Sequence, residues 1–242
     1  MKTDGGEAGG RAPLRTYLLG SLEFDQALAL QRGLVYQLSG GAPAALILCE
    51  HPPLITVGRH GGPGQIHAGP GELASRGWAV RWVPRGGGAV LHLPGQLAVY
   101  PVLPLGRLGL GVAAYIELLQ EVLVAVLDDF GVSGQTRAGQ AGVWVGRRPI
   151  AAVGVAVRHG VSTFGAVLNI DPDLTLFRLV EAGAPGDGPM TSLARERRGP
   201  PRAALVRQRL LEHFAGRFGF GETDLVFHPP GQPGHERLAA RS

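Results

Sequence analysis

The sequence is poor in two side chains on which many active sites depend, cysteine and lysine. Cys49 is the only cysteine among the 242 residues, which excludes an intramolecular disulfide and a cysteine-cluster metal site and suits a reducing compartment. Lys2 is the only lysine, so arginine supplies nearly all of the positive charge. No apolar run is long enough to span a bilayer, and the first residues contain no basic-then-apolar leader. We therefore expect a cytoplasmic protein that makes no membrane contact.

Charge and spacing also argue against several binding functions. The 23 basic and 19 acidic residues give a formal net charge of +4. The sequence contains no basic helix, zinc finger or alternation of aromatic and basic residues, so no nucleic-acid partner is predicted. The histidines lack His-Glu-x-x-His or comparable spacing, and we predict neither a metal nor a cofactor.

The pattern along the chain predicts one α+β domain between two tails. Residues 1–13 are polar and glycine-rich and are predicted to be disordered, and residues 227–242 are predicted to form a C-terminal tail. The domain between them, 14–226, contains apolar residues at helical spacing in 21–38, 112–130 and 202–218. The continuous apolar run at 44–49 predicts a buried strand, with further short strands around the segment described next.

The most informative stretch is residues 85–101, in which three glycines lie between two apolar runs. Glycine permits a turn at positive φ and close approach of a ligand to the backbone. Taken alone, these glycines fit a hairpin in which His92 is merely structural. The whole string from Arg85 to Gln96, however, resembles the Arg-Gly-Gly-x-x-x-x-His-x-Pro-Gly-Gln signature of the lipoyl(octanoyl) transferases, within the superfamily of biotin and lipoate protein ligases.

Other segments extend this resemblance from about residue 18 to residue 193. Residues 50–58 resemble the family's Glu-His-x-x-x-x-Thr-x-Gly signature, and the glycine-rich segment 61–71 stands where such enzymes carry a mobile stretch over the acyl site. Residues 150–155 and 165–169 resemble two strands whose backbone lines the acyl pocket. The resemblance implies the α+β fold of biotin and lipoate protein ligases, a mixed β-sheet packed by helices.

The function implied by the resemblance is that of an octanoyltransferase of lipoate biosynthesis. Such an enzyme moves octanoyl from octanoyl-acyl carrier protein to a lysine of lipoyl domains, in 2-oxoacid dehydrogenases and in the glycine cleavage H protein. The substrate-binding residues that it implies are Arg85, Gly86, Gly87, Gly88, Ala89, Val90, Leu91, His92, Ala152, Val153, Gly154, Gly165, Ala166 and Val167.

The resemblance fails at the reacting groups. Family members form a thioester on a cysteine that a lysine activates, and those positions hold Gly183 and Pro149 in this sequence. A family histidine is replaced by Phe164. We therefore expect no covalent mechanism. His92 is the best remaining acid–base candidate, because histidine titrates near neutral pH, although orienting the glycine loop by a hydrogen bond is an equal alternative.

Other polar residues offer less. Cys49 lies in an apolar run and is interpreted as a buried core residue. Arg147 and Arg148 lie next to the lost lysine and could supply positive charge but no base, and neither Asp187 nor Ser192 has a visible activating partner.

Two alternative functions stay open at this point. One is a catalytically inactive paralogue that binds octanoyl or lipoyl cargo or its carrier proteins, which the missing reacting groups favour. The other is an ATP-using lipoate ligase, which the absence of lysine after Lys2 disfavours.

Overall fold

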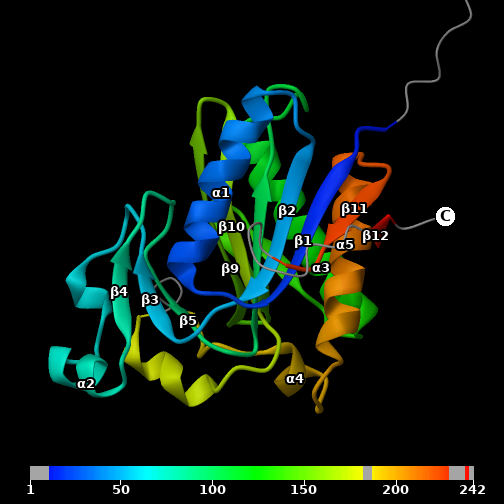
Figure 1. Cartoon of the computed structure of the whole chain (residues 1–242). Helices are drawn as coiled ribbons and strands as arrows, with labels where there is room; N and C mark the ends of the chain where they lie inside the picture. The colour runs from blue at the N-terminus through cyan, green and yellow to red at the C-terminus, as the bar shows by residue number, and fades with distance from the viewer. Residues whose placement is uncertain (1–10, 182–186, 229–237, 240–242) are drawn as a thin grey trace, which may run out of the picture.

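The computed structural model describes residues 11–181, 187–228 and 238–239, and it contains a large mixed sheet and a small one (Figure 1). The large sheet, in spatial order, consists of β12 (Leu238–Ala239), β11 (Thr223–Val226), β1 (Leu14–Ser21), β2 (Ala44–Glu50), β6 (Gln96–Val102), β10 (Val161–Asn169), β9 (Arg148–Arg158), β8 (Gln140–Val145) and β7 (Gln135–Arg137). The small sheet consists of β4 (Ala79–Trp82), β3 (Leu54–Val57) and β5 (Ala89–His92).

Helices cover both faces of the large sheet. The helices are α1 (Phe24–Ser39), α2 (Pro70–Ser75), α3 (Val112–Asp129), α4 (Leu193–Glu196) and α5 (Ala203–Phe218), with 3₁₀ turns η1 (Pro63–Gln65) and η2 (Leu174–Leu179). In β2, Leu46 and Leu48 belong to the core formed with α3 and α5, whereas Ala45 and Ile47 belong to the core formed with α1. A strand buried on both faces has no polar side, which explains the continuous apolar run and confirms the strand predicted there.

The predicted fold class is confirmed, and so are the three long helices, which lie where the apolar spacing predicts α1, α3 and α5. Strands β1 and β11 were not predicted. They pair with each other in parallel across most of the chain, from Leu14 opposite Thr223 onward, and such pairing leaves no local pattern. The domain limits 14–226 remain a prediction, because most of both tails lies outside the described residues. No helix in the described part of the chain is long and apolar enough to cross a membrane.

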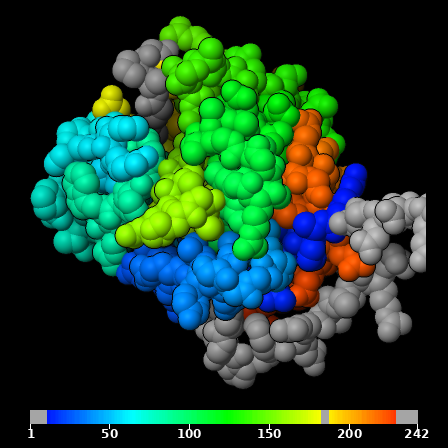
Figure 2. Space-filling view, turned by 90° about the horizontal axis from the view of Figure 1, so that it is seen from above, coloured from blue at the N-terminus to red at the C-terminus, as the bar shows by residue number. Residues whose placement is uncertain are grey.

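The small sheet and α2 form a lobe beside the large sheet. Figure 2 shows this lobe (cyan to teal) next to the end of the β9–β10 hairpin (yellow-green) and α1 (blue). An apolar cluster joins the two parts, with Phe24 from α1, Leu54 and Val83 from the lobe, and Phe164 from β10. The segment from Arg85 to Gly88, called the glycine loop below, connects β4 to β5 and lies at this junction.

Thr16 in β1 provides a test of the core. Its side chain is completely buried, and its hydroxyl has no hydrogen-bond partner among the described residues. Thr16→Val should raise the free energy of unfolding by about 1 kcal/mol, because it removes an unsatisfied buried hydroxyl. Thr16→Ser keeps the hydroxyl and loses a methyl group, so it should lower that free energy by about 1 kcal/mol. Urea unfolding measures both, and a loss of stability in Thr16→Val would contradict this description.

Candidate active site

A cavity of about 270 Å³ lies between the small lobe and the large sheet. The glycine loop and β5 form one wall, and β9 and β10 form another. Of the residues predicted to bind substrate, all but Gly86 and Leu91 line this cavity. The Gly86 N–H donates to Val155 O at 2.9 Å and ties the loop to β9, while Leu91 is buried in the core of the small lobe. The sequence signature therefore brings its residues together around one space, although their role in binding remains a prediction.

Glycine is required at two positions in these walls. A Cβ on Gly154 would lie 2.8 Å from Gly86 O and 3.2 Å from Arg85 Cδ, so a side chain there would push the glycine loop away from β9. Gly87 has a φ of 82°, a conformation that costs other residues free energy. The close contact between the loop and β9 thus depends on the absence of these side chains.

The guanidinium of Arg85 is buried and donates three hydrogen bonds to nearby oxygens. Its NH1 donates to Gly86 O at 2.9 Å, and its NH2 donates to Thr56 Oγ1 at 2.7 Å and to Thr56 O at 3.0 Å. Burial lowers the pKa of Arg85 to about 10, so the group keeps its charge at neutral pH. A permanent positive charge therefore stands behind the glycine loop.

His92 lies beside this charge with its ring almost completely buried. Its Nε2 is 3.0 Å from Thr56 Oγ1, and the centroid of its ring is 5.5 Å from that of His51. Burial lowers the pKa of His92 well below the usual value, and the neighbouring His51 and Arg85 lower it further. The ring is neutral at physiological pH, so the near-neutral titration on which its predicted acid–base role depended is absent. The hydrogen bond that it makes goes to Thr56 in β3.

His51 links the end of β2 to the cavity wall. Its Nδ1 is 2.6 Å from Leu22 O, and its Nε2 is 2.8 Å from the hydroxyl of Tyr100, which lines the cavity. Burial lowers the pKa of His51. Cys49 is also buried, with Sγ 3.8 Å from His51 Nε2, and burial followed by the charge of Glu50 raises the pKa of its thiol. The only thiol of the chain is therefore protonated and away from the cavity lining, in agreement with its interpretation as a core residue.

Phe164, at the position of the family histidine, closes one side of the cavity. Its φ is 57°, and its N–H donates to Gln31 Oε1 at 2.7 Å. A left-handed conformation at a bulky residue costs about 1–3 kcal/mol and persists only where the surroundings hold it. Buried Gln31 of α1 supplies that restraint, so an apolar ring stands where the family places a polar one.

The position that the resemblance assigns to the family lysine also holds a residue without an ionisable side chain, Pro149. Pro149 lies opposite Trp144 in the β8–β9 pair and lines a separate hollow of about 80 Å³ next to the main cavity. Its carbonyl accepts a hydrogen bond from Thr191 N at 2.9 Å. Gly183, at the position of the family cysteine, lies outside the described residues.

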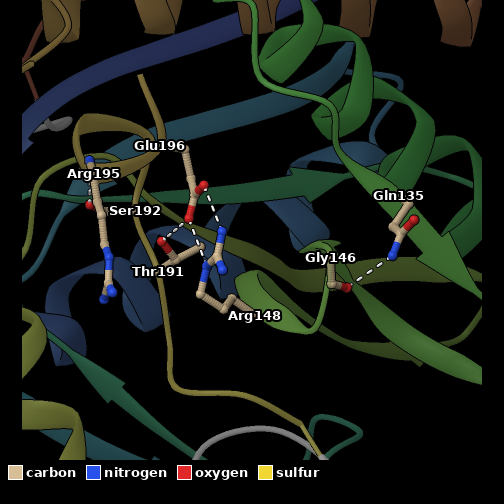
Figure 3. Close-up of polar contacts among 7 residues, drawn as sticks. All are labelled: Gln135, Gly146, Arg148, Thr191, Ser192, Arg195 and Glu196. Carbon is tan, nitrogen blue, oxygen red and sulfur yellow. Dashed lines mark hydrogen bonds and ion pairs between the residues drawn. The ribbon is translucent and has the colours of Figure 1, made fainter. Parts of the chain in front are cut away.

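The neighbouring cation does not replace the lysine. Figure 3 shows Arg148 and Thr191 converging on Glu196 of α4. Arg148 donates to both carboxylate oxygens at 2.9 Å, and Thr191 Oγ1 donates at 2.5 Å. Burial would raise the pKa of Glu196, but Arg148, Thr191 and Arg195 together lower it. The charge of Arg148 is thus neutralised by this bidentate pair.

The remaining polar candidates have structural contacts. Ser192 caps α4 by accepting the Arg195 N–H at 3.3 Å, and Asp187 accepts from Arg137 at 2.5 Å. Among the described residues, no three His, Cys, Asp or Glu side chains are grouped to hold a metal ion.

Several residues of the site were missed in the sequence. Thr56 stands in the second signature and could have been singled out there. Gln65 carries no such signal, yet its side-chain Oε1 accepts the Ala89 N–H at 2.9 Å. Its main-chain carbonyl accepts the Glu181 N–H at 2.8 Å. Other cavity-lining residues that were not singled out as binding substrate are Phe24, Tyr100, Gln140, Ala141, Trp144, Phe164 and Glu181. The stretch 61–71, expected to be mobile, contains η1, and Gln65 within it is hydrogen-bonded both to Ala89 at the start of β5 and to Glu181.

The two buried histidines predict how stability depends on pH. Both have a lowered pKa when folded, so below about pH 6.5 the unfolded chain binds more protons than the folded one. The free energy of unfolding should therefore fall on acidification from pH 7.5 to 5.5, by up to about 1.4 kcal/mol per pH unit for each histidine. His92→Gln should reduce this slope by about one proton. Urea unfolding at several pH values measures this slope. An equal slope in the unchanged protein and in His92→Gln would contradict the burial of a neutral His92.

Comparison with known proteins places the chain in a family. Residues 23–215 match the lipoyl protein ligase A/B catalytic domain. An octanoyltransferase of Nitratidesulfovibrio vulgaris (strain DP4) is 41% identical over 178 residues, which cover 74% of this chain and 82% of that protein. An octanoyltransferase of Chloroflexus aggregans is 41% identical over 202 residues, which cover 82% of this chain and 91% of that protein.

Solved structures agree on the fold. Lipoate-protein ligase A bound with ATP has a TM-score of 0.72 at 16% identity and covers 89% of this chain and 90% of its own. A chain from the structure of a bi-partite lipoate protein ligase and its E2 lipoyl domain from Thermoplasma acidophilum has a TM-score of 0.70 at 16% identity. The match covers 90% of this chain and 89% of that chain. Since the family match spans most of the chain and relatives are 41% identical over most of their length, this protein belongs to the lipoyl protein ligase A/B catalytic domain family.

Proposed function

We propose that the protein is an octanoyltransferase of lipoate biosynthesis in the cytoplasm. It takes octanoyl from octanoyl-acyl carrier protein and transfers it to a lysine of lipoyl domains, those of 2-oxoacid dehydrogenases and of the glycine cleavage H protein. The observation that carries this proposal is the cavity between the glycine loop and β9–β10, because its lining includes all of the residues predicted to bind substrate except Gly86 and Leu91. The identity of 41% to octanoyltransferases supports it.

The transfer takes place without an acyl-enzyme, because no thiolate is available at the cavity. The neutral amine of the acceptor lysine attacks the acyl carbon of the bound thioester. The C–N bond forms as the C–S bond breaks, and the proton that the amine loses goes to the departing carrier thiolate. Holding the two reactants together supplies up to roughly 7–11 kcal/mol when their geometry is ideal.

The alternative function is a catalytically inactive paralogue that binds octanoyl or lipoyl cargo or its carrier proteins. Pro149 and Phe164 favour it, because each stands at the position of a reacting group of the family and neither can transfer a proton. The carboxylate that neutralises Arg148 favours it too.

Direct transfer can be tested by mass spectrometry. The protein, octanoyl-acyl carrier protein and an apo lipoyl domain should yield octanoylated lipoyl domain at a rate above the enzyme-free rate. The intact mass of the protein should show no octanoyl adduct, since the pKa of the Cys49 thiol is raised by burial.

Cys49→Ala is the control for that experiment, because it removes the only thiol of the chain and leaves the cavity lining intact. Its transfer rate should equal that of the unchanged protein. A hydroxylamine-labile adduct on Cys49 would overturn the direct route. No transfer above background, with octanoyl-acyl carrier protein still bound, would establish the binding function instead.

The glycine loop can be tested as part of the acyl site through Gly154→Ala. The added Cβ would lie 2.8 Å from Gly86 O, so it should displace the loop and weaken the binding of octanoyl-acyl carrier protein about tenfold, as measured by calorimetry. Gly33→Ala is the matched control, since Gly33 is exposed on α1 with no atom within 4 Å of an added Cβ. It should bind normally and be up to about 1 kcal/mol more stable. Equal affinity in both variants would place the acyl site elsewhere.

A further inference from the structure

The hydrogen bonds from Arg85 through Thr56 to His92 fix the position of each proton. A guanidinium only donates, so NH2 of Arg85 donates to Thr56 Oγ1 at 2.7 Å. The hydrogen of the Thr56 hydroxyl then needs an acceptor, and His92 Nε2, 3.0 Å away, provides one. A neutral imidazole whose Nε2 accepts a hydrogen bond carries its proton on Nδ1. The contacts therefore select the Nδ1–H tautomer of His92.

A second set of contacts fixes the proton of Tyr100 in the opposite sense. Leu22 O can only accept, so His51 Nδ1, 2.6 Å away, carries a hydrogen. His51 Nε2 is then an acceptor, and the Tyr100 hydroxyl donates to it at 2.8 Å. The Tyr100 hydrogen is thus turned toward His51, and its oxygen offers the cavity only lone pairs.

Of the buried rings that line the cavity, Tyr100 therefore accepts and His92 donates, while Trp144 carries a further Nε1–H that is buried without a partner among the described residues. Nδ1 of His92 makes no hydrogen bond to the described residues. It is also absent from the set of fully buried polar atoms without a partner, so it remains accessible. The ring of His92 thus has one free donor, and because the ring is almost completely buried, its hydrogen bond to a developing charge is stronger than the same bond in water.

We propose that His92 Nδ1–H donates a hydrogen bond to the carbonyl oxygen of the acyl thioester, with Thr56 and Arg85 as positioning residues that select this tautomer. This role rests on the proposed function, because it requires an acyl thioester in the cavity. As the acceptor amine adds to the acyl carbon, negative charge develops on that oxygen, and the imidazole stabilises it. The ring keeps its proton throughout, so His92 acts neither as a base nor as an acid.

The surroundings of the ring keep it neutral. Burial disfavours a positive charge on His92, His51 from the end of β2 and Arg85 from the glycine loop disfavour it further, and Tyr100 of β6 lies beside His51. A second proton would also have to enter at Nε2, where the Thr56 hydroxyl already donates. The donor is therefore available over the whole range in which an exposed histidine changes charge.

Nitrogen-15 NMR of the full-length chain tests this directly. Long-range proton–nitrogen spectra of histidine-labelled protein, with His92 assigned by its loss in His92→Gln, should show the Nδ1–H tautomer unchanged from pH 6.0 to 8.5. Octanoyl-acyl carrier protein should move the Nδ1–H proton downfield. The Nε2–H tautomer, a titration within that range, or an unmoved proton at saturation would each overturn the proposal.

Variants of Thr56 separate positioning from mere packing. Thr56→Val keeps the shape and removes the hydroxyl, so it should give a mixture of tautomers and lower kcat at least about tenfold with little change in KM. Thr56→Ser should restore the tautomer and most of kcat. Thr16→Val removes a buried threonine hydroxyl remote from the cavity and should alter neither. If Thr56→Val retains the pure Nδ1–H tautomer, Thr56 does not select it and the proposal is overturned.

The two proposals can fail separately. A downfield shift of the His92 proton without any transfer to a lipoyl domain would contradict the proposed enzymatic function and support the hydrogen bond to the acyl carbonyl. Transfer without that shift would support the enzymatic function and overturn the role of His92.

Discussion

The buried charge of Arg85 is the constraint on which the site depends. Removing a guanidinium from water costs several kcal/mol unless oxygens surround it, and here Gly86 and Thr56 supply them. The glycine loop must curl around the charge to bring Gly86 O into place, and Gly154 must lack a side chain to let the loop do so. The shape of the cavity and the orientation of His92 both follow from the need to supply hydrogen-bond acceptors to the buried guanidinium of Arg85.

The scaffold of the family is kept while its reacting groups are replaced. Phe164 has a left-handed backbone that Gln31 holds, and its apolar ring packs with Phe24 at the edge of the cavity. Arg148, next to the lost lysine, is bound to Glu196 and contributes no free charge. Catalysis in such a site has to come from positioning and from hydrogen bonds to the substrate, because the means of forming an acyl-enzyme are absent from the described residues.

Much of this could be predicted from the sequence, and the exceptions have physical causes. Apolar spacing located α1, α3 and α5, and the signature around His92 together with the strand segments 152–154 and 165–167 located most of the cavity lining. The acid–base role of His92 was inferred from the pKa of an exposed histidine, and burial beside Arg85 reverses that inference. The contacts of Gln65 depend on a loop held between two distant segments, and no local pattern encodes them.

The pairing of β1 with β11 has a consequence for synthesis of the chain. β1 leaves the ribosome before the other strands that the structure describes, and β11 lies more than 200 residues later. At about 5–20 residues per second, the edge of β1 stays open for at least roughly ten seconds while the rest is made. An open strand edge invites pairing with other chains, and contacts so distant in sequence slow folding. In a nascent chain of this protein, β2 can therefore cover one edge of β1 early, whereas the other edge stays open until β11 is made.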